Sequence, residues 1–105
     1  MLDFHLASPD EIVQALGQRL RAQRLSRLMP QAELALRAGV ALGSVKQLEA
    51  TGNTTLQTFV RVIQALALTD EITGLLQLKP ATSIAAMESA EHAQRQRARR
   101  PRSKP

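Results

Sequence analysis

The stretch QAELALRAGVALGSVKQLE, residues 31–49, decides the fold expected of this chain. Apolar residues recur at helical spacing in each half, so each half presents one narrow apolar stripe. Gly39 stands between the halves, where a glycine can take a positive φ without a Cβ clash and end the first helix. The pattern therefore predicts two short helices folded over a tight turn. The stripe residues are Leu34, Ala35 and Ala38 before the turn and Val45 and Leu48 after it.

A helix-turn-helix of this size cannot bury both stripes by itself, so its neighbours must complete the core. Upstream, Ser8, Pro9 and Glu11 form a helix start in which Ser8 is the N-cap and Glu11 closes a capping box. We expect this first helix to cover residues 9–27. Its arginines are expected on or near the solvent side, namely Arg19, Arg21, Arg24 and Arg27.

Downstream, apolar residues at helical spacing predict a helix over residues 55–67, capped by Thr54 or Thr55. A fifth helix follows, with Thr69 or Asp70 as its cap. The helix over residues 55–67 is expected to close the core. The residues of the fifth helix expected to point inward are Ile72, Leu75 and Leu76.

The composition favours an all-α fold. A chain of 105 residues has room for one domain and a tail, because a single core usually occupies about 100 to 150 residues. Only 2% of the residues are aromatic, which favours small helices over a sheet. We divide the chain into an N-terminal arm over residues 1–8, a helix-turn-helix domain over 9–79 and a tail over 80–105.

The N-terminal arm has a weak strand pattern. Leu2, Phe4 and Leu6 alternate with polar residues, a period of two that suits a short strand. The pattern also suits an extended arm, and a strand here would pair with another molecule. The alternative is a frayed terminus that packs Phe4 on the domain.

Positive charge is concentrated in the tail. The net charge is +5, yet residues 1–91 carry eight basic and nine acidic side chains, whereas residues 92–105 carry six basic side chains and no acidic one. The tail is expected to be partly helical, supported by a Glu91–Arg95 pair, and disordered from Arg97 onward. An arginine-rich tail can contact DNA phosphates, fold on an acidic partner, or serve only solubility.

Four segments, in this order, resemble the XRE-type, lambda-repressor-like family of DNA-binding proteins. They are LGQRLRAQRL (16–25), QAELALRAGV (31–40), LE (48–49) and GNTTLQTFVRVIQALAL (52–68). The loop and fourth helix, with the arginine-rich end, resemble in particular the HipB-type antitoxins. The resemblance implies a five-helix domain in which the third helix enters the major groove and the second crosses the backbone. It also implies a homodimer on double-stranded operator DNA.

Carried over by position, the resemblance implies particular DNA contacts. Gln31 would contact a phosphate, Lys46 would act as a point charge, and Gln47 can bond adenine through two hydrogen bonds. Ser44 can bond a base or a phosphate. Further contact residues are Leu42 and Gly43 on the outward face, Thr51 and Asn53 in the loop, and Arg95, Arg97, Arg99 and Arg100 in the tail.

Two departures from the family pattern leave alternatives open. Pro30 and Ala41 precede the second and third helices, and neither side chain can cap. Leu42 could touch a thymine methyl group or be buried at a protein contact.

From the family resemblance, we expect a repressor that is also the antitoxin of a cognate toxin. The alternatives are a stand-alone repressor and a toxin-neutralising module with weak DNA binding.

The sequence lacks the residue patterns expected for metal binding, catalysis or cofactor binding. There is no cysteine, and His5 and His92 have no partners at metal-ligand spacing. No phosphate-binding glycine motif or catalytic triad pattern occurs, so we expect no enzyme activity, no cofactor, no metal and no small-molecule substrate. No apolar run approaches the length of a membrane span, so we expect a cytoplasmic, nucleoid-associated protein.

Overall fold

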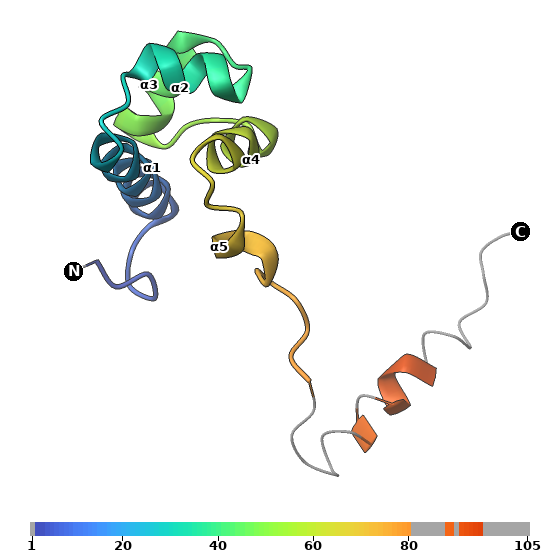
Figure 1. The fold of residues 1–105 in the computed structure, drawn as a ribbon. Helices are drawn as coiled ribbons and strands as arrows, with labels where there is room; N and C mark the ends of the chain where they lie inside the picture. The colour runs from blue at the N-terminus through green and yellow to red at the C-terminus, as the bar shows by residue number, and fades with distance from the viewer. Residues whose placement is uncertain (1, 81–87, 90, 96–105) are drawn as a thin grey trace, which may run out of the picture. The chain divides into compact units, whose positions relative to one another are not determined.

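The structure is a computed structural model, and it describes residues 2–80, 88–89 and 91–95. The chain divides into two compact units, Met1–Leu75 and Leu76–Pro105. The described residues are helical or irregular and contain no strand, which confirms the all-α expectation for this part of the chain (Figure 1). The helices of the first unit are α1 (Pro9–Ser26), α2 (Gln31–Ala38), α3 (Leu42–Thr51), α4 (Leu56–Ala65) and α5 (Asp70–Thr73).

Side-chain caps begin α1 and α4, as the sequence predicts. The Ser8 hydroxyl accepts the Glu11 amide at 3.2 Å, and the Ser8 amide donates to the Glu11 carboxylate at 2.8 Å. At α4, the Thr55 hydroxyl accepts the Thr58 amide at 3.1 Å. These bonds satisfy first-turn amides that a helix leaves without partners, so both starts are determined locally.

The link between α2 and α3 is a tight turn at Gly39. Gly39 has a φ of 69°, and the Val40 amide donates to the Ala35 carbonyl at 3.0 Å across it. This is the left-handed helix ending that glycine favours. The predicted pair of short helices over a glycine turn is therefore present.

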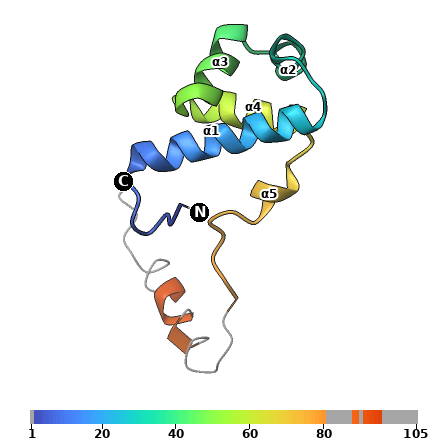
Figure 2. The same cartoon turned by 90° about the vertical axis from the view of Figure 1, so that its left-hand side faces the viewer.

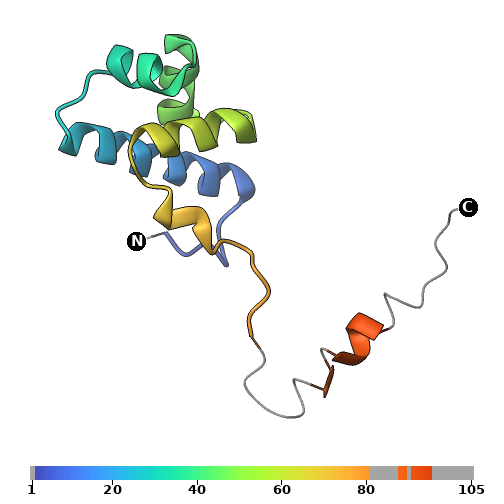
Figure 3. The ribbon, with the colours of Figure 1, turned by 45° about the vertical axis from the view of Figure 1, so that its right-hand side comes forward.

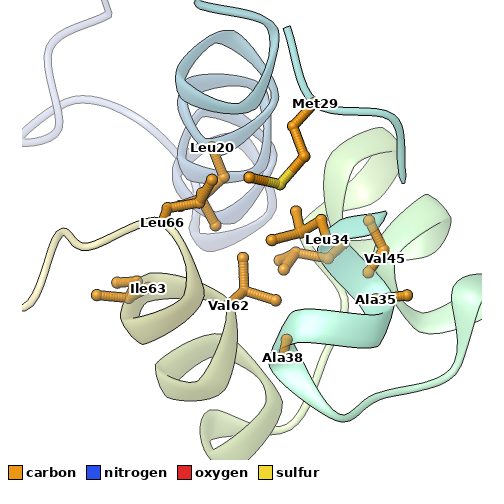
Figure 4. Packing of buried hydrophobic residues seen from close by; sticks show 10 residues of the cluster. Leu20, Met29, Leu34, Ala35, Ala38, Val45, Val62, Ile63 and Leu66 are labelled. Carbon is orange, nitrogen blue, oxygen red and sulfur yellow. The ribbon is translucent and has the colours of Figure 1, made fainter. Parts of the chain in front are cut away.

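Side chains from α1 to α4 and from the α1–α2 link converge on one core. Leu34, Val45 and Val62 are fully buried at its centre, and Met29 enters from the link between α1 and α2 (Figure 4). Predicted stripe residues of α2 and α3 thus meet those of the flanking helices. The core consists of Leu20, Met29, Leu34, Ala35, Ala38, Val45, Leu48, Val62, Ile63 and Leu66.

Two glycines allow α1 to approach the end of α3. A Cβ atom at Gly17 would collide with the carbonyl oxygen of Leu48, and one at Gly52 would collide with the backbone of Val13. Gly52 also has a φ of 79°. Backbone therefore packs on backbone here, at a distance that no side chain would permit.

The described residues of the N-terminal arm form no strand within this chain. Residues 4–6 form a turn, in which the Leu6 amide donates to the Asp3 carbonyl at 3.1 Å and the His5 amide to the Asp3 carboxylate at 2.9 Å. Aspartate commonly stabilises such turns by accepting from the backbone two residues on. The alternative holds in part, because the Phe4 ring centroid lies 5.0 Å from the Arg19 guanidinium.

The α5 helix is shorter than expected. It ends at Thr73, and although Ile72 is partly buried against the core, Leu75 is 60% exposed. Leu76, which opens the second unit, is 92% exposed with a φ of 62°. The expectation that both leucines point inward is therefore wrong, because the helix stops before either one.

In the second unit, residues 88–89 and 91–95 are helical. The predicted pair is present, with 3.6 Å between the Arg95 guanidinium and the Glu91 carboxylate. The predicted disorder from Arg97 onward falls outside the described residues. Among the helices that are described, none combines the length and the apolar character needed to cross a membrane.

Candidate nucleic-acid interface

The inner face of α3 is buried against the rest of the first unit. Val45, Leu48 and Glu49 recur at helical spacing and are all buried. In Figure 2, α2 and α3 lie on one side of α1, and the side of α3 that does not face the other helices is turned away from the domain. Packing of the inner face therefore determines which residues of α3 remain outside.

The outward face of α3 holds most of the contact residues predicted within the first unit. Gly43 and Gln47 are exposed and four residues apart, so they share a face. Lys46 is exposed beside them, and Ser44 is half-buried at the edge. Leu42, the first residue of the helix, is 38% exposed. This face therefore presents an amide, an ammonium group and a hydroxyl together.

Thr51 and Asn53 lie where α3 ends. The Thr51 hydroxyl donates to the Gln47 carbonyl at 2.9 Å and accepts the Asn53 amide at 3.1 Å. Both hydrogen bonds are local and hold the chain as it leaves the helix. The Thr51 side chain thus shapes the loop beside the outward face, and both residues are exposed.

The first turns of α2 and α3 lack side-chain caps. Pro30 and Ala41 occupy the N-cap positions without a side-chain hydrogen bond, as the sequence predicts. In contrast, side chains cap the first turns of α1 and α4, from Ser8 and Thr55 respectively. Uncapped first-turn amides carry a partial positive charge and are suited to an anion such as phosphate.

Gln31 is held within the domain. It is the first residue of α2, and its side-chain amide donates to the Glu49 carboxylate at 3.0 Å. Its side chain thus connects the start of α2 to the buried face of α3. The predicted phosphate contact of Gln31 would compete with this bond.

Arg24 is buried rather than solvent-facing, so its predicted placement is wrong. Its side chain donates twice to Glu49, from Nε to Oε2 at 2.7 Å and from Nη2 to Oε1 at 2.9 Å. Its Nη1 donates to the Met29 carbonyl at 2.7 Å. The pair joins the end of α1 to α3 and neutralises the only acid of α3.

This pairing shifts both ionisation equilibria toward the charged forms. The hydrogen bond with Glu49 raises the pKa of Arg24, although burial opposes the change. For Glu49, burial alone would raise the pKa, but hydrogen bonds from Arg24 and Gln31 outweigh it and the pKa is lowered. The positive charges of Arg24 and Arg21 add to this lowering. The carboxylate therefore stays ionised although it is buried.

Arg24 and Glu49 are the residues of this site that the sequence reading missed, although a signal for them exists. Arg24 follows Leu16 and Leu20 in steps of four, which places it on the apolar stripe of α1. Glu49 similarly follows Val45 by four. Opposite charges on two apolar stripes indicate a buried pair, because an unpaired charge there would be costly.

The predicted tail contacts are largely outside the described residues. Arg95 is exposed in the second unit, next to Glu91. Arg97, Arg99 and Arg100 belong to the part that the structure does not describe.

The contact residues of the first unit come from three consecutive segments: the start of α2, α3 and the loop after it. Their arrangement is stabilised by one core and one buried ion pair. No protein-family model matches this chain, and no curated protein matches it.

Proposed function

We propose that this protein is a DNA-binding transcriptional repressor of the XRE-type, lambda-repressor-like kind that its sequence resembles, with α3 in the major groove. The observation that carries the proposal is the difference between the buried and the exposed face of α3. Its only acid is buried and paired with Arg24, while Lys46 and Gln47 are exposed on the opposite face. An exposed helix with amide and cationic groups and no exposed carboxylate is suited to the base edges and phosphates of DNA.

Each group at the interface has a role in this proposal. The Gln47 amide forms two hydrogen bonds with adenine, and Lys46 neutralises a phosphate. The uncapped first turns of α2 and α3 offer backbone amides to neighbouring phosphates. Two copies on a pseudo-palindromic operator would place two α3 helices about 34 to 36 Å apart.

We also propose that the protein is the antitoxin of a toxin–antitoxin operon and represses that operon. Support comes from the resemblance to HipB-type antitoxins and from the six basic side chains after residue 91. A neighbouring reading frame that encodes a toxin, and co-purification of its product, would support this part. Their absence would favour a stand-alone repressor, with the DNA-binding proposal unchanged.

One observation favours a second candidate, a protein-neutralising module with weak DNA binding. Leu42 is 38% exposed at the start of α3, and Gly43 beside it has no side chain for contacts with bases. An exposed leucine can serve as a protein contact as readily as it meets a thymine methyl group.

Fluorescence anisotropy with the DNA upstream of the protein's own gene tests base recognition. Ser44→Ala combined with Gln47→Ala should weaken binding about 10- to 100-fold, and should weaken it less on scrambled DNA. Gln18→Ala combined with Gln64→Ala removes exposed polar groups from α1 and α4 and should leave affinity unchanged. Equal affinities for wild type and the Ser44 and Gln47 double variant would contradict the base contacts and favour the protein-neutralising module.

A further inference from the structure

A polar hollow of about 500 Å³ lies between α2 and α4. We call it the α2–α4 hollow. In Figures 1 and 3, α4, in yellow-green, lies beneath α2, in blue-green. Each of the two helices contributes one arginine to the hollow. Its polar lining residues are Arg37 in the last turn of α2 and Gln57, Arg61 and Gln64 of α4.

The two arginines bring more positive charge to the hollow than their surroundings neutralise. Arg37 pairs with Glu33 on its own helix, with 2.6 Å between the guanidinium and the carboxylate. Among the described residues, no ion pair involves Arg61, and no acidic residue lines the hollow. Like charges on two facing helices repel each other. An anion between the two arginines would be attracted by both.

The Arg61 guanidinium is available for a ligand. Within the described part of the chain it makes one hydrogen bond, from Nη1 to the Gly39 carbonyl oxygen at 3.5 Å. This distance exceeds the usual range of about 2.7 to 3.2 Å for an N–H donor, so the bond holds the group weakly. A guanidinium has five N–H donors in a planar fork that matches two oxygens of a phosphate. Gln57 and Gln64 are exposed on the same helix.

We infer that the α2–α4 hollow is a binding site for a small organic phosphate. Arg37 and Arg61 hold the phosphate group from opposite walls, and the Gln57 and Gln64 amides bond to polar groups on the rest of the molecule. The volume of the hollow falls in the range of about 300 to 1,000 Å³ that is usual for small-molecule sites. A phosphate suits two guanidinium groups better than a carboxylate, because its three free oxygens can contact both at once.

The hollow is separate from the surface that we propose for DNA. Arg37 lies six residues after Gln31, which at the rise of an α-helix is about 9 Å along α2 from the turn offered to DNA phosphates. No residue of α3, all of which the structure describes, lines the hollow. A phosphate at Arg61 would nevertheless lie beside Gly39, at the turn between α2 and α3. Binding at the hollow does not require DNA and can be tested without it.

Titration of the ¹⁵N-labelled full-length chain, followed by NMR at constant ionic strength, tests the site. The probes are inorganic phosphate and ribose 5-phosphate. Both should cause saturable shifts at the side-chain N–H groups of Arg37 and Arg61, and ribose 5-phosphate should also shift the Gln57 and Gln64 amides. Arg37→Gln and Arg61→Gln should each weaken the binding of both probes about tenfold or more, the usual effect of losing a hydrogen bond to a charged group.

A variant that should bind more tightly makes the test independent of folding defects. Glu33→Gln removes the carboxylate that competes with the ligand for Arg37. It should strengthen phosphate binding about two- to fivefold, which corresponds to the contribution of an exposed ion pair. Unchanged or weaker binding in this variant would contradict a role for Arg37 in holding the phosphate.

Matched substitutions keep the test specific. Arg21→Gln makes the same charge change on α1, outside the hollow, and should leave phosphate binding unchanged. Lys46→Gln should weaken DNA binding but leave phosphate binding unchanged, because Lys46 lies on α3. Far-UV circular dichroism checks that each variant is folded.

Three outcomes would overturn the inference. The first is the absence of saturable shifts at Arg37 and Arg61 with either probe at millimolar concentration. The second is binding that persists when Arg37→Gln and Arg61→Gln are combined, which would place the phosphate site elsewhere. The third is a loss of operator affinity in the combined variant while neither probe binds the wild type, which would assign both arginines to the DNA backbone. In each case, the anisotropy assay for Gln47 decides the DNA-binding proposal separately.

Discussion

The Arg24 guanidinium and the Glu49 carboxylate form a buried ion pair with two hydrogen bonds, of 2.7 and 2.9 Å. The same arginine donates to the Met29 carbonyl, and the same carboxylate accepts from Gln31. One pair thus connects the end of α1, the link after it, the start of α2 and the inner face of α3. We regard it as the interaction that positions α3 relative to α2.

Removal of one partner of this pair should destabilise the domain strongly. Arg24→Met leaves the Glu49 carboxylate buried without its counter-charge, a change that typically costs about 3 to 5 kcal/mol. The combination of Arg24→Met and Glu49→Leu leaves no buried charge and should recover most of this loss. Urea unfolding followed at 222 nm measures both. A loss below about 1 kcal/mol for Arg24→Met would contradict the role of the pair.

The stability that Glu49 contributes should decrease in acid. Its pKa in the folded protein is lowered, so its ionised form contributes stability that is fully present above the unfolded-state pKa of about 4.3. This contribution is lost as the pH falls below that value through the folded-state pKa. The difference in unfolding free energy between wild type and Glu49→Gln should be constant from about pH 7 to 5.5 and then narrow.

Glu33→Gln is the control for this pH series. Glu33 pairs with Arg37 at 2.6 Å on the surface of α2. An exposed pair of this type contributes at most about 1 kcal/mol, so its pH dependence should be small. Similar pH profiles for the two glutamine variants would indicate that the Glu49 pair is no stronger than a surface pair.

Gly17→Ala should destabilise the domain although alanine is the better helix former. Its Cβ would collide with the Leu48 carbonyl oxygen, so α1 and α3 must separate, at a cost of about 1 to 3 kcal/mol. Gly43→Ala is the matched control, because nothing lies within 4 Å of a Cβ there. It should stabilise α3 by up to about 1 kcal/mol. Thermal unfolding distinguishes the two; equal effects would contradict the close packing at Gly17.

Leu28→Gly should stabilise the domain. Leu28 has a φ of 52° in the link after α1 and is 92% exposed, so its side chain strains the backbone and packs little. Removing the strain should contribute about 0.5 to 1 kcal/mol. Leu36→Gly, at an exposed position inside α2, should instead cost about 1 kcal/mol. A destabilised Leu28→Gly variant would contradict the left-handed geometry.

Replacing Arg97, Arg99 and Arg100 with glutamine tests whether the tail contacts DNA. If all three contact phosphates, the slope of log K against log salt should become shallower by roughly 2.7. Arg21→Gln, on α1, is the single-charge control and should change the slope little. The slope is measured by anisotropy between low and physiological salt. An unchanged slope in the triple variant would indicate that the tail binds a protein partner or only keeps the protein soluble.

The sequence by itself determined the local structure of the first unit. The capping box of Ser8 and Glu11, the Thr55 cap and the turn at Gly39 involve residues within five positions of one another. Such interactions depend on short-range geometry, so a linear pattern predicts them. The apolar stripes of α2 and α3 were predictable for the same reason, because helical periodicity determines which residues share a face.

Only the tertiary structure decided which residues far apart in the sequence contact one another. Arg24 and Glu49 are 25 residues apart, and an arginine among other arginines indicates a solvated face unless its partner is known. The contact of Gly17 with Leu48 depends on how two helices cross. The Asp3 turn replaced a strand because a lone strand has no neighbour to accept its hydrogen bonds. Long-range packing and pairing decided these features, and helical periodicity carries no information about either.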